Sequence, residues 1–226
     1  MKIHVLPSGP IKTIGYLLTN ASLGEAILID APGDILEKIT PLLAQEGCRL
    51  KELWLTHGHW DHTQDSARLK RELAVLIRAH RADQALIETP ELMEEFMGAR
   101  LGLEPAKIDV FFTPGETLTA VGRDFAVRHV PGHCAGNVLF YAAALQGPTG
   151  LTASTAFVGD ALFKAGVGRW DLQGGGFEVL AQSIRSQIYT LPDDTIVFPG
   201  HGPRTTVGEE KVTNPYVPLI AAQRPV

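Results

Sequence analysis

The sequence predicts an α+β protein that contains two β-sheets with helices on their outer sides. Three observations support this fold class. Short β-rich apolar runs separated by Pro, Gly and Asn open the chain, which is typical of a meander of strands. Helical stretches then alternate with strands, and after Pro105 a second series of strands begins. Each half loosely repeats the same order of elements and no linker separates the halves, so we expect one domain over residues 1–226.

The first half opens with three expected strands, at residues 3–6, 14–19 and 25–30. A helix is predicted over residues 34–47, because apolar side chains recur there at helical spacing and Gly47 follows its end. Pro41 lies inside this stripe, where it either kinks the helix or starts a fresh turn. The other expected elements of this half are a strand at 50–56, a helix at 63–74, a strand at 74–80 and helices at 81–89 and 90–103.

The second half is expected to be rich in strands, at residues 110–113, 116–121, 125–130, 138–145 and 155–159. A long helix at 177–191, a strand at 195–199 and a last helix at 207–212 follow. On the predicted helix at 90–103, large apolar side chains recur at helical spacing, at Met93, Phe96, Met97 and Leu101. Either they pack in the core or they form the wall of a lid over a cleft.

The composition is that of an ordinary globular protein, with 45% hydrophobic and 20% charged residues. A net charge of −5 without any basic run argues against nucleic acid or an anionic membrane as a partner. The longest apolar run, at 138–145, is too short to span a bilayer, and the first ten residues lack the pattern of a secretory signal. Because Cys48 and Cys134 make no disulfide framework, we expect a protein of the reducing cytoplasm.

Residues 56–62, with the sequence THGHWDH, concentrate polar side chains where a buried strand is expected to end. His57 and His59 alternate, so both can point at one position from an extended loop. Asp61 and His62 leave the same loop in another direction, at the start of a helix. Neutral imidazole and carboxylate are the ligands that zinc and iron favour. The pattern therefore indicates a metal site more strongly than a polar surface loop.

One loop cannot complete such a site, but three other predicted strand ends carry a histidine or an acid beside glycine. These residues are His133 in VPGHCAG, Asp160 in FVGDALF and His201 in VFPGHGP. Glycine allows the backbone to turn sharply and to approach a ligand closely. With the first loop, these strand ends supply seven candidate ligands, of which five are histidines.

In this order, the motifs THGHWDH, PGH, GD and PGHGP resemble those of the metallo-β-lactamase fold superfamily. Two further stretches are similar to its glyoxalase II-like branch, the hydroxyacylglutathione hydrolases. They are GVGRWDLQGG at 166–175, which also resembles a segment of the persulfide dioxygenases, and PGHGPRTTVGEEKVTNPYV at 199–217. The resemblance covers nearly the whole chain and implies a four-layer αββα sandwich with a two-metal site at the sheet edges.

The resemblance also distributes the candidate ligands between two metal ions. The first ion would be held by three histidines, His57, His59 and His133. The second would be held by one acid and two histidines, Asp61, His62 and His201. Asp160 would bridge both ions, which are expected to be zinc, with iron or manganese as alternatives.

Three more residues receive expected roles around this site. Asp30 matches a family position that supports the metal loop, although a turn-forming aspartate before Pro32 would look the same. Thr56 could hydrogen-bond within the site, although β propensity alone would place a threonine there. Arg169 lies where the family tends to place a basic residue near the thiol carrier, so it is the candidate substrate-binding residue.

The expected chemistry is acyl hydrolysis by a metal-bound hydroxide, without a nucleophile from the protein. A shared carboxylate can hold two metals about 3.5–4 Å apart, and metal binding brings the pKa of a water near 7. Asp61, the only acid in the first loop, is expected to be catalytic by orienting this hydroxide. The absence of a G-x-S-x-G motif agrees with this mechanism. The resemblance implies a small acyl thioester, such as S-lactoylglutathione, as the substrate.

Other functions stay open at this point. A mononuclear iron persulfide dioxygenase would need only three of the ligands, His57, His133 and Asp160. A metal-dependent lactonase or esterase of the same fold is a further alternative, whereas seven intact ligands disfavour a module that only binds. The chain is expected to lack the C-terminal helical extension of full-length glyoxalase II. The expected partner is a small-molecule thioester, and a homodimer is left open.

Overall fold

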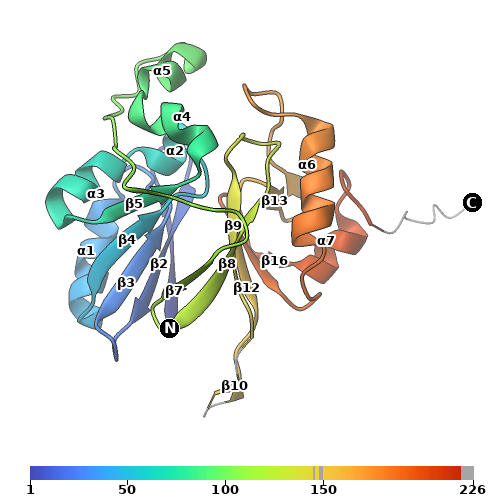
Figure 1. Ribbon diagram of the computed structural model, residues 1–226, viewed down its shortest axis with the longest axis horizontal. Coiled ribbons are helices and arrows are strands. Elements are labelled where there is room, and N and C mark those ends of the chain that lie inside the picture. Colours follow the sequence, from blue (N-terminus) through green and yellow to red (C-terminus); the bar gives the residue numbers. More distant parts are fainter. Residues whose placement is uncertain (145, 148–149, 220–226) are drawn as a thin grey trace, which may run out of the picture.

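The computed structural model describes residues 1–144, 146–147 and 150–219, so the predicted end of a strand at Leu145 lies outside the described residues. Two six-stranded sheets face each other at the centre of the molecule, and helices lie on the outer side of each sheet (Figure 1). The predicted α+β class and the four-layer αββα sandwich are therefore confirmed.

The first sheet contains strands from the first half of the chain, in sequence order β1-β2-β3-β4-β5-β6. Their bounds are Lys2–Ser8, Thr13–Asn20, Glu25–Ile29, Arg49–Trp54, Leu76–Ala79 and Val110–Phe111. The first three strands are antiparallel, and β3 to β6 run parallel. Parallel strands end at the same edge of a sheet, so the loop after β4 lies at the same edge as the segment after β3.

The second sheet has the order β16-β15-β12-β9-β8-β7. In chain order, its strands are β7 Thr117–Ala120, β8 Arg123–His129, β9 Val138–Ala142, β12 Thr155–Gly159, β15 Ile196–Pro199 and β16 Thr205–Thr206. Two small hairpins lie outside it, namely β10 Gln146–Gly147 with β11 Gly150–Leu151, and β13 Leu162–Phe163 with β14 Gly166–Val167. β12 and β15 are parallel, with Gly159 opposite Pro199, so the segments after both strands leave the sheet side by side.

Helices α1 (Ile35–Glu46) and α3 (Ser66–Leu73) cover the outer face of the first sheet, and α6 (Phe177–Ser183) and α7 (Val207–Thr213) cover that of the second (Figure 1). Shorter helices lie near the edge where the loops gather. They are α2 Trp60–Thr63, the 3₁₀ turn η1 Arg81–Asp83, α4 Gln84–Glu88 and α5 Glu91–Met97. A π turn, η2 Ile184–Ile188, continues α6. Among the described helices, none is both long and apolar enough to cross a lipid bilayer.

Alternation along the strands produces three apolar layers. On β2, Tyr16 and Leu18 face the second sheet, whereas Leu17 lies in the layer beneath α1. Trp54 packs between the sheets against Phe125, with ring centroids 5.3 Å apart. Because successive side chains of a strand point to opposite faces, strands buried on both faces consist almost entirely of apolar residues. This explains why β2 and β3 could be recognised in the sequence.

The helix predicted over 90–103 is shorter than expected and ends at Met97. Gly98 adopts the left-handed conformation that closes a helix, with φ of 63°. The carboxylate of Glu94 then accepts the backbone N–H groups of Leu101 and Gly102, at 2.7 and 2.8 Å, and holds the chain in a loop. The helix predicted over 63–74 corresponds to α3, which begins at Ser66, and the separate turn α2 precedes it.

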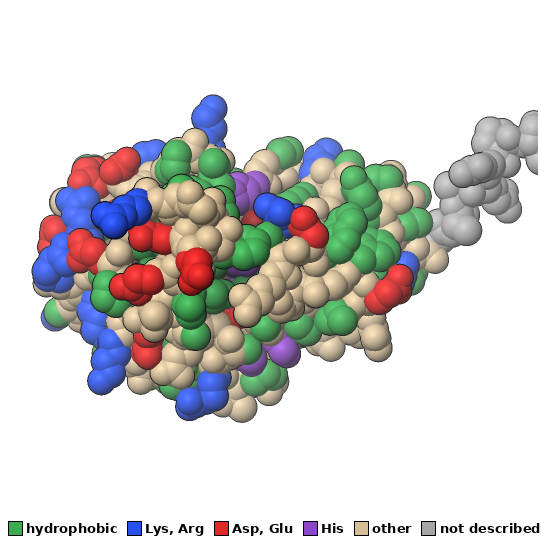
Figure 2. All heavy atoms as spheres, turned by 90° about the horizontal axis from the view of Figure 1, so that it is seen from above, with side chains coloured by type: hydrophobic (Ala, Val, Ile, Leu, Met, Phe, Trp, Pro, Cys, Tyr) green, Lys and Arg blue, Asp and Glu red, His purple; other side chains and the backbone are tan. Residues whose placement is uncertain are grey.

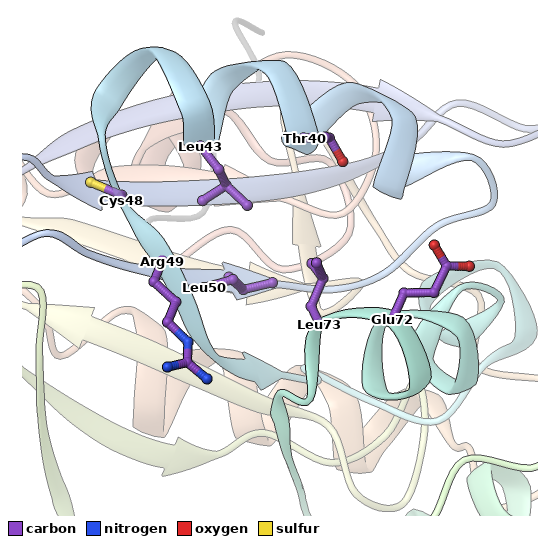
Figure 3. A pocket seen from close by; sticks show the side chains of 7 residues that line it. All are labelled: Thr40, Leu43, Cys48, Arg49, Leu50, Glu72 and Leu73. Atoms are coloured by element: carbon purple, nitrogen blue, oxygen red, sulfur yellow. The ribbon is translucent and has the colours of Figure 1, made fainter.

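A pocket of about 380 Å³ lies on the outer side of the first sheet, between α1, β4 and α3 (Figure 3). It is lined by three leucines, Leu43, Leu50 and Leu73, together with Thr40, Cys48, Arg49 and Glu72. None of the candidate metal ligands lines this pocket.

Candidate metal centre

The seven candidate ligands follow the ends of strands from both sheets and meet at one edge of the sandwich. Residues 56–62 follow β4, Asp160 follows β12, and His201 follows β15. The N–H of Gly200 donates to the carbonyl of Gly159 at 2.8 Å, which holds the last two segments together. Figure 2 shows histidine side chains in the hollow between the two halves of the molecule.

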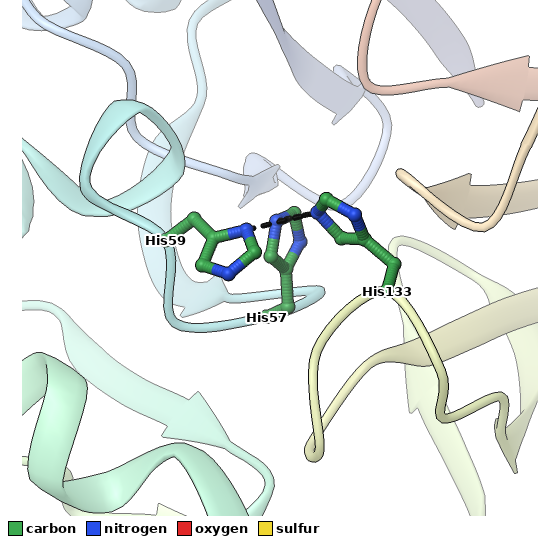
Figure 4. Close-up of side chains that lie close together, drawn as sticks. All are labelled: His57, His59 and His133. Carbon is green, nitrogen blue, oxygen red and sulfur yellow. Dashed lines mark hydrogen bonds between the residues drawn. The ribbon is translucent and has the colours of Figure 1, made fainter. Parts of the chain in front are cut away.

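His57, His59 and His133 form the first group of ligand atoms. Nε2 of His133 lies 2.8 Å from Nδ1 of His59 and 3.2 Å from Nε2 of His57. The three rings are buried and point toward one another, two from the loop after β4 and one from the loop after β8 (Figure 4). Their nitrogen atoms could therefore hold one cation.

Asp61, His62 and His201 form a second group. Oδ2 of Asp61 lies 3.3 Å from Nε2 of His62 and 3.2 Å from Nε2 of His201. The turn of α2 separates this group from the first, because His59 is still extended whereas Asp61 and His62 are helical. The predicted divergence of the loop is thus present in the structure.

Asp160 lies between the two groups. Its Oδ1 is 3.3 Å from Nε2 of His62, and its Oδ2 is 3.4 Å from Nε2 of His201 and 3.6 Å from Nε2 of His133. One carboxylate therefore faces ligand atoms of both groups, which is the placement that a bridging ligand needs.

The chemistry of these residues fits bound metal ions. Nε2 of His62 and Oδ1 of Asp160 are buried and lie 3.3 Å apart, but within the described part of the chain neither makes a hydrogen bond of good geometry. Such groups are costly unless something satisfies them. Five imidazoles and two carboxylates are a donor set that suits zinc, iron or manganese.

Asp30 holds two segments of the metal loop at once. Its Oδ1 accepts the N–H of Thr56 at 2.7 Å, and its Oδ2 accepts the Thr56 hydroxyl at 2.8 Å and lies 2.8 Å from Nδ1 of His62. The backbone of Asp30 is left-handed, with φ of 60°, which is uncommon outside glycine. Because a bond at Nδ1 orients the ring, Nε2 of His62 points at the site.

Other hydrogen bonds orient the remaining ligands. The Thr56 hydroxyl lies 3.0 Å from Nδ1 of His57, and Nδ1 of His133 donates to the carbonyl of Arg169 at 2.7 Å. Thr13, at the start of β2, donates its hydroxyl to Oδ2 of Asp61 at 2.6 Å. Thr13 had not been identified from the sequence, where a threonine at the start of a strand carries no signal of function.

Burial and charge divide four of the histidines into two kinds. Burial lowers the pKa of His57 well below its ordinary value and lowers that of His59 to about 3, so both rings are neutral at pH 7. Burial also acts on His62, but three neighbouring carboxylates outweigh it and raise its pKa well above the ordinary value. Burial is likewise outweighed at His201, where hydrogen bonds to two carboxylates raise the pKa to about 9. Metal binding beside these two rings would therefore release protons.

Comparison with known proteins identifies the family. A family model described as the metallo-beta-lactamase superfamily matches residues 16–201. The chain belongs to this superfamily. It is 36% identical to hydroxyacylglutathione hydrolase GloC of Haemophilus influenzae, over 96% of this chain and 98% of that protein.

Two solved structures of the metallo-beta-lactamase fold illustrate the similarity. The BLEG-1 B3 metallo-beta-lactamase superposes with a TM-score of 0.81 and is 32% identical, over 96% of this chain and 99% of that one. TTHA1623 in a di-iron-bound form superposes with a TM-score of 0.78 and is 34% identical, over 94% of this chain and 99% of that one.

In this member of the metallo-beta-lactamase superfamily, a buried carboxylate that had not been identified from the sequence connects the two loops of the first histidine group. Oδ2 of Asp83 accepts the N–H of Gly58 at 2.9 Å and the thiol of Cys134 at 3.1 Å, and its Oδ1 accepts the N–H of Gly136 at 2.7 Å. Asp83 follows β5 just as the candidate ligands follow their strands, but it has no neighbouring glycine. Its position just after a strand was the feature of the sequence that could have indicated a role at the metal centre.

Replacing Asp83 with asparagine is expected to weaken metal binding about tenfold, the lower end of the effect of losing a group that orients a metal site. The amide has one acceptor oxygen instead of two, so it can hold Gly58 or Gly136 but not both. The dissociation constant for zinc, measured by competition with a chromogenic chelator, tests this expectation.

Asp109 offers a matched control, since its Oδ2 accepts the N–H of Ile77 at 2.8 Å on a distant part of the first sheet. Asp109→Asn should lower the melting temperature and leave zinc affinity unchanged. If Asp83→Asn also lowered only the melting temperature, Asp83 would be a residue of the fold and not of the metal centre.

The candidate ligands open into a cleft of about 350 Å³. Arg169 lines this cleft, as the substrate-binding prediction requires, but its guanidinium bonds both carboxylate oxygens of the neighbouring Asp171, at 2.9 and 3.0 Å. Met93 and Met97 also line the cleft, so part of the stripe predicted on 90–103 forms its wall.

The remaining histidines and cysteines lie outside the cluster. His80 and His129 stack on each other with ring centroids 4.3 Å apart, and His4 lies 3.2 Å from the hydroxyl of Thr19. Cys134 is fully buried, and burial raises the pKa of its thiol well above the ordinary value. A protonated thiol is a poor metal ligand and a poor nucleophile, so Cys134 is an inert neighbour of the site.

Proposed function

We propose that this chain is a dinuclear metal-dependent hydrolase of small acyl thioesters, with S-lactoylglutathione as its reference substrate. One observation carries the proposal: the buried carboxylate of Asp160 faces both groups of ligand atoms, at 3.3 Å from Nε2 of His62, 3.4 Å from Nε2 of His201 and 3.6 Å from Nε2 of His133. The first ion would be held by His57, His59 and His133, and the second by Asp61, His62 and His201. Zinc is the metal we propose, with iron or manganese as alternatives.

When bound, such ions supply a nucleophilic water at neutral pH and polarise the substrate carbonyl. The side chains of the protein position the reacting groups. Asp61 lines the cleft, and the Thr13 hydroxyl fixes the carboxylate by donating to its Oδ2. We propose that Asp61 orients the attacking water. Asp30 and Thr56 keep His62 and His57 turned toward the site, so little reorganisation is needed during the reaction.

The relatives support hydrolysis and bear on the choice of carrier. GloC is named a hydroxyacylglutathione hydrolase, and the match extends over 98% of its length. A protein of about this length therefore carries that name without a long additional segment. Arg169 remains the proposed contact for a carboxylate of the thiol carrier, although Asp171 already binds it.

We expect the zinc-loaded protein to hydrolyse S-lactoylglutathione under anaerobic conditions, because hydrolysis consumes water and no oxygen. Elemental analysis of the same preparation should find about two metal ions per chain, as a two-metal hydrolytic site requires. Release of free thiol, followed with a chromogenic disulfide, measures the reaction.

The test separates the main alternatives. Oxygen uptake with glutathione persulfide by the iron-loaded form, together with no thioesterase activity of the zinc form, would make the chain a persulfide dioxygenase. Faster turnover of a lactone or simple ester than of every thioester would assign it to the lactonase or esterase class. Metal content that stays at one ion per chain would contradict the bridging role of Asp160.

A further inference from the structure

The cleft beside the candidate ligands is lined mainly by large apolar side chains. Apart from the ligands and Arg169, the described residues that line the cleft are all apolar: Ile11, Trp60, Met93, Met97, Phe163 and Leu172. These residues come from the segment before β2, from α2 and α5, and from segments on either side of β14. A substrate carbonyl that reaches the ligands must therefore pass an apolar wall.

The apolar wall continues beyond the cleft along the short helices. A smaller hollow shares His59, Met93 and Leu172 with the cleft and adds Leu86, Leu92, Phe96 and Gln173. We call this continuous surface, from the candidate ligands along α4 and α5, the apolar groove. Phe96 and Met97 are 46% and 41% exposed, although they are large apolar side chains. Clustered exposure of this kind beside a polar centre marks a binding groove.

The cleft offers little net positive charge to bind a highly anionic ligand. Among the residues that the structure describes, Arg169 is the single Lys or Arg that lines the cleft, and Asp171 binds its guanidinium through two oxygens. Much of its charge is therefore already offset at this solvent-exposed position. The groove thus offers apolar area to a substrate and little net positive charge.

We propose that the site selects acyl thioesters whose acyl group is an apolar chain or ring, which lies in the apolar groove. This inference rests on the proposed hydrolase function. The apolar part is assigned to the acyl group because the common cellular thiol carriers are polar. Burying one CH₂ group is worth roughly 0.8 kcal/mol, a factor of about four, and a half-buried chain should gain about twofold per CH₂.

A chain-length series on one neutral carrier tests the proposal. Thioesters of N-acetylcysteamine with acetyl, butyryl, hexanoyl and octanoyl groups are hydrolysed by the zinc-loaded protein, and kcat/KM is compared. From butyryl onward, the intrinsic reactivity of the carbonyl hardly changes, so the slope reports burial of the chain. We expect kcat/KM to rise about twofold to fourfold per CH₂ between butyryl and hexanoyl.

Binding of non-hydrolysable thioethers separates the groove from the catalysis. S-ethyl, S-butyl and S-hexyl thioethers of N-acetylcysteamine are titrated into the zinc-loaded protein by calorimetry, and the dissociation constant should fall by a similar factor per CH₂. The exposed groove residues Phe96 and Met97 can be changed to serine with little effect on the core, and both changes should flatten the two slopes. Val212→Ser is the matched control, because Val212 is 54% exposed on α7, a helix that does not line the groove.

Each outcome decides one of the two claims. Hydrolysis of all the thioesters with no dependence on chain length would overturn the apolar groove and leave the hydrolase intact. Thioether affinity that rises with chain length without any thioester hydrolysis would support the groove and reject the proposed function. If Phe96→Ser and Met97→Ser left both slopes as steep as Val212→Ser does, the chain would bind elsewhere and the proposal would be wrong.

Discussion

Replacing Asp61 with asparagine is expected to lower kcat for thioester hydrolysis by roughly 10²–10⁴, the usual effect of losing a positioned charged group. The amide keeps the shape of the side chain and removes its charge. In the structure, Oδ2 of Asp61 accepts the Thr13 hydroxyl at 2.6 Å and lies within 3.3 Å of Nε2 of His62. An NH₂ group in the place of Oδ2 could no longer accept the Thr13 hydroxyl, which would have to rotate and accept a hydrogen bond instead.

Metal content must be measured on the same preparation, because loss of a metal and loss of a charge would both slow turnover. Asp171→Asn is the matched control: the same chemical change at the rim of the cleft, on a side chain that contacts Arg169 and no candidate ligand. We expect that variant to change KM by a few-fold at most. Normal turnover by Asp61→Asn with two metals bound would remove Asp61 from the mechanism.

The parts of the fold that could be predicted are those with a local cause. Strands β2 and β3 are buried on both faces, so their sequences are nearly continuous apolar runs bounded by turn residues, whereas β4 is buried only at Leu50, Leu53 and Trp54. The candidate ligands could be found for a related reason. A sheet places the ends of its parallel strands at one edge, so a histidine or an acid just after a strand is brought near the others.

The parts that could not be predicted depend on contacts between distant segments. Asp83 joins Gly58 to Gly136, and nothing in the residues around it shows that these two loops lie on either side of its carboxylate. The early end of α5 depends on Glu94, whose carboxylate captures the chain beyond Gly98. Helical periodicity describes one face of a helix and does not indicate that a side chain will bind the backbone beyond the end of that helix.

The positions of individual atoms in the site were also beyond the sequence. The sequence separated His57 from His62 as members of two groups, yet their ring centroids lie 4.1 Å apart, and both rings share a group with Asp160. Spacing along a loop predicts the direction in which side chains leave the backbone. The distances between them depend on how closely the two sheets pack.

Changing Gly200 to alanine is expected to remove metal from the site and to lower activity roughly 10²-fold, the effect of a displacement of about 1 Å at a reacting centre. A Cβ atom on Gly200 would lie 2.1 Å from Oδ1 of Asp160 and 2.6 Å from Cε1 of His62. No pair of atoms tolerates such distances, so the bridging carboxylate or the ring must move. The backbone itself cannot easily yield, because the N–H of Gly200 bonds the carbonyl of Gly159.

Gly202, two residues further on, supplies the matched control for this substitution. Its φ is 76°, and a Cβ atom there would meet no atom of the described residues within 4 Å. Gly202→Ala should therefore cost about 1 kcal/mol of folding stability through its left-handed backbone and leave the metal content unchanged. Elemental analysis and thermal unfolding of both variants distinguish the two effects. Full metal content and normal activity in Gly200→Ala would show that Asp160 and His62 can shift without disturbing the site, and the prediction would be wrong.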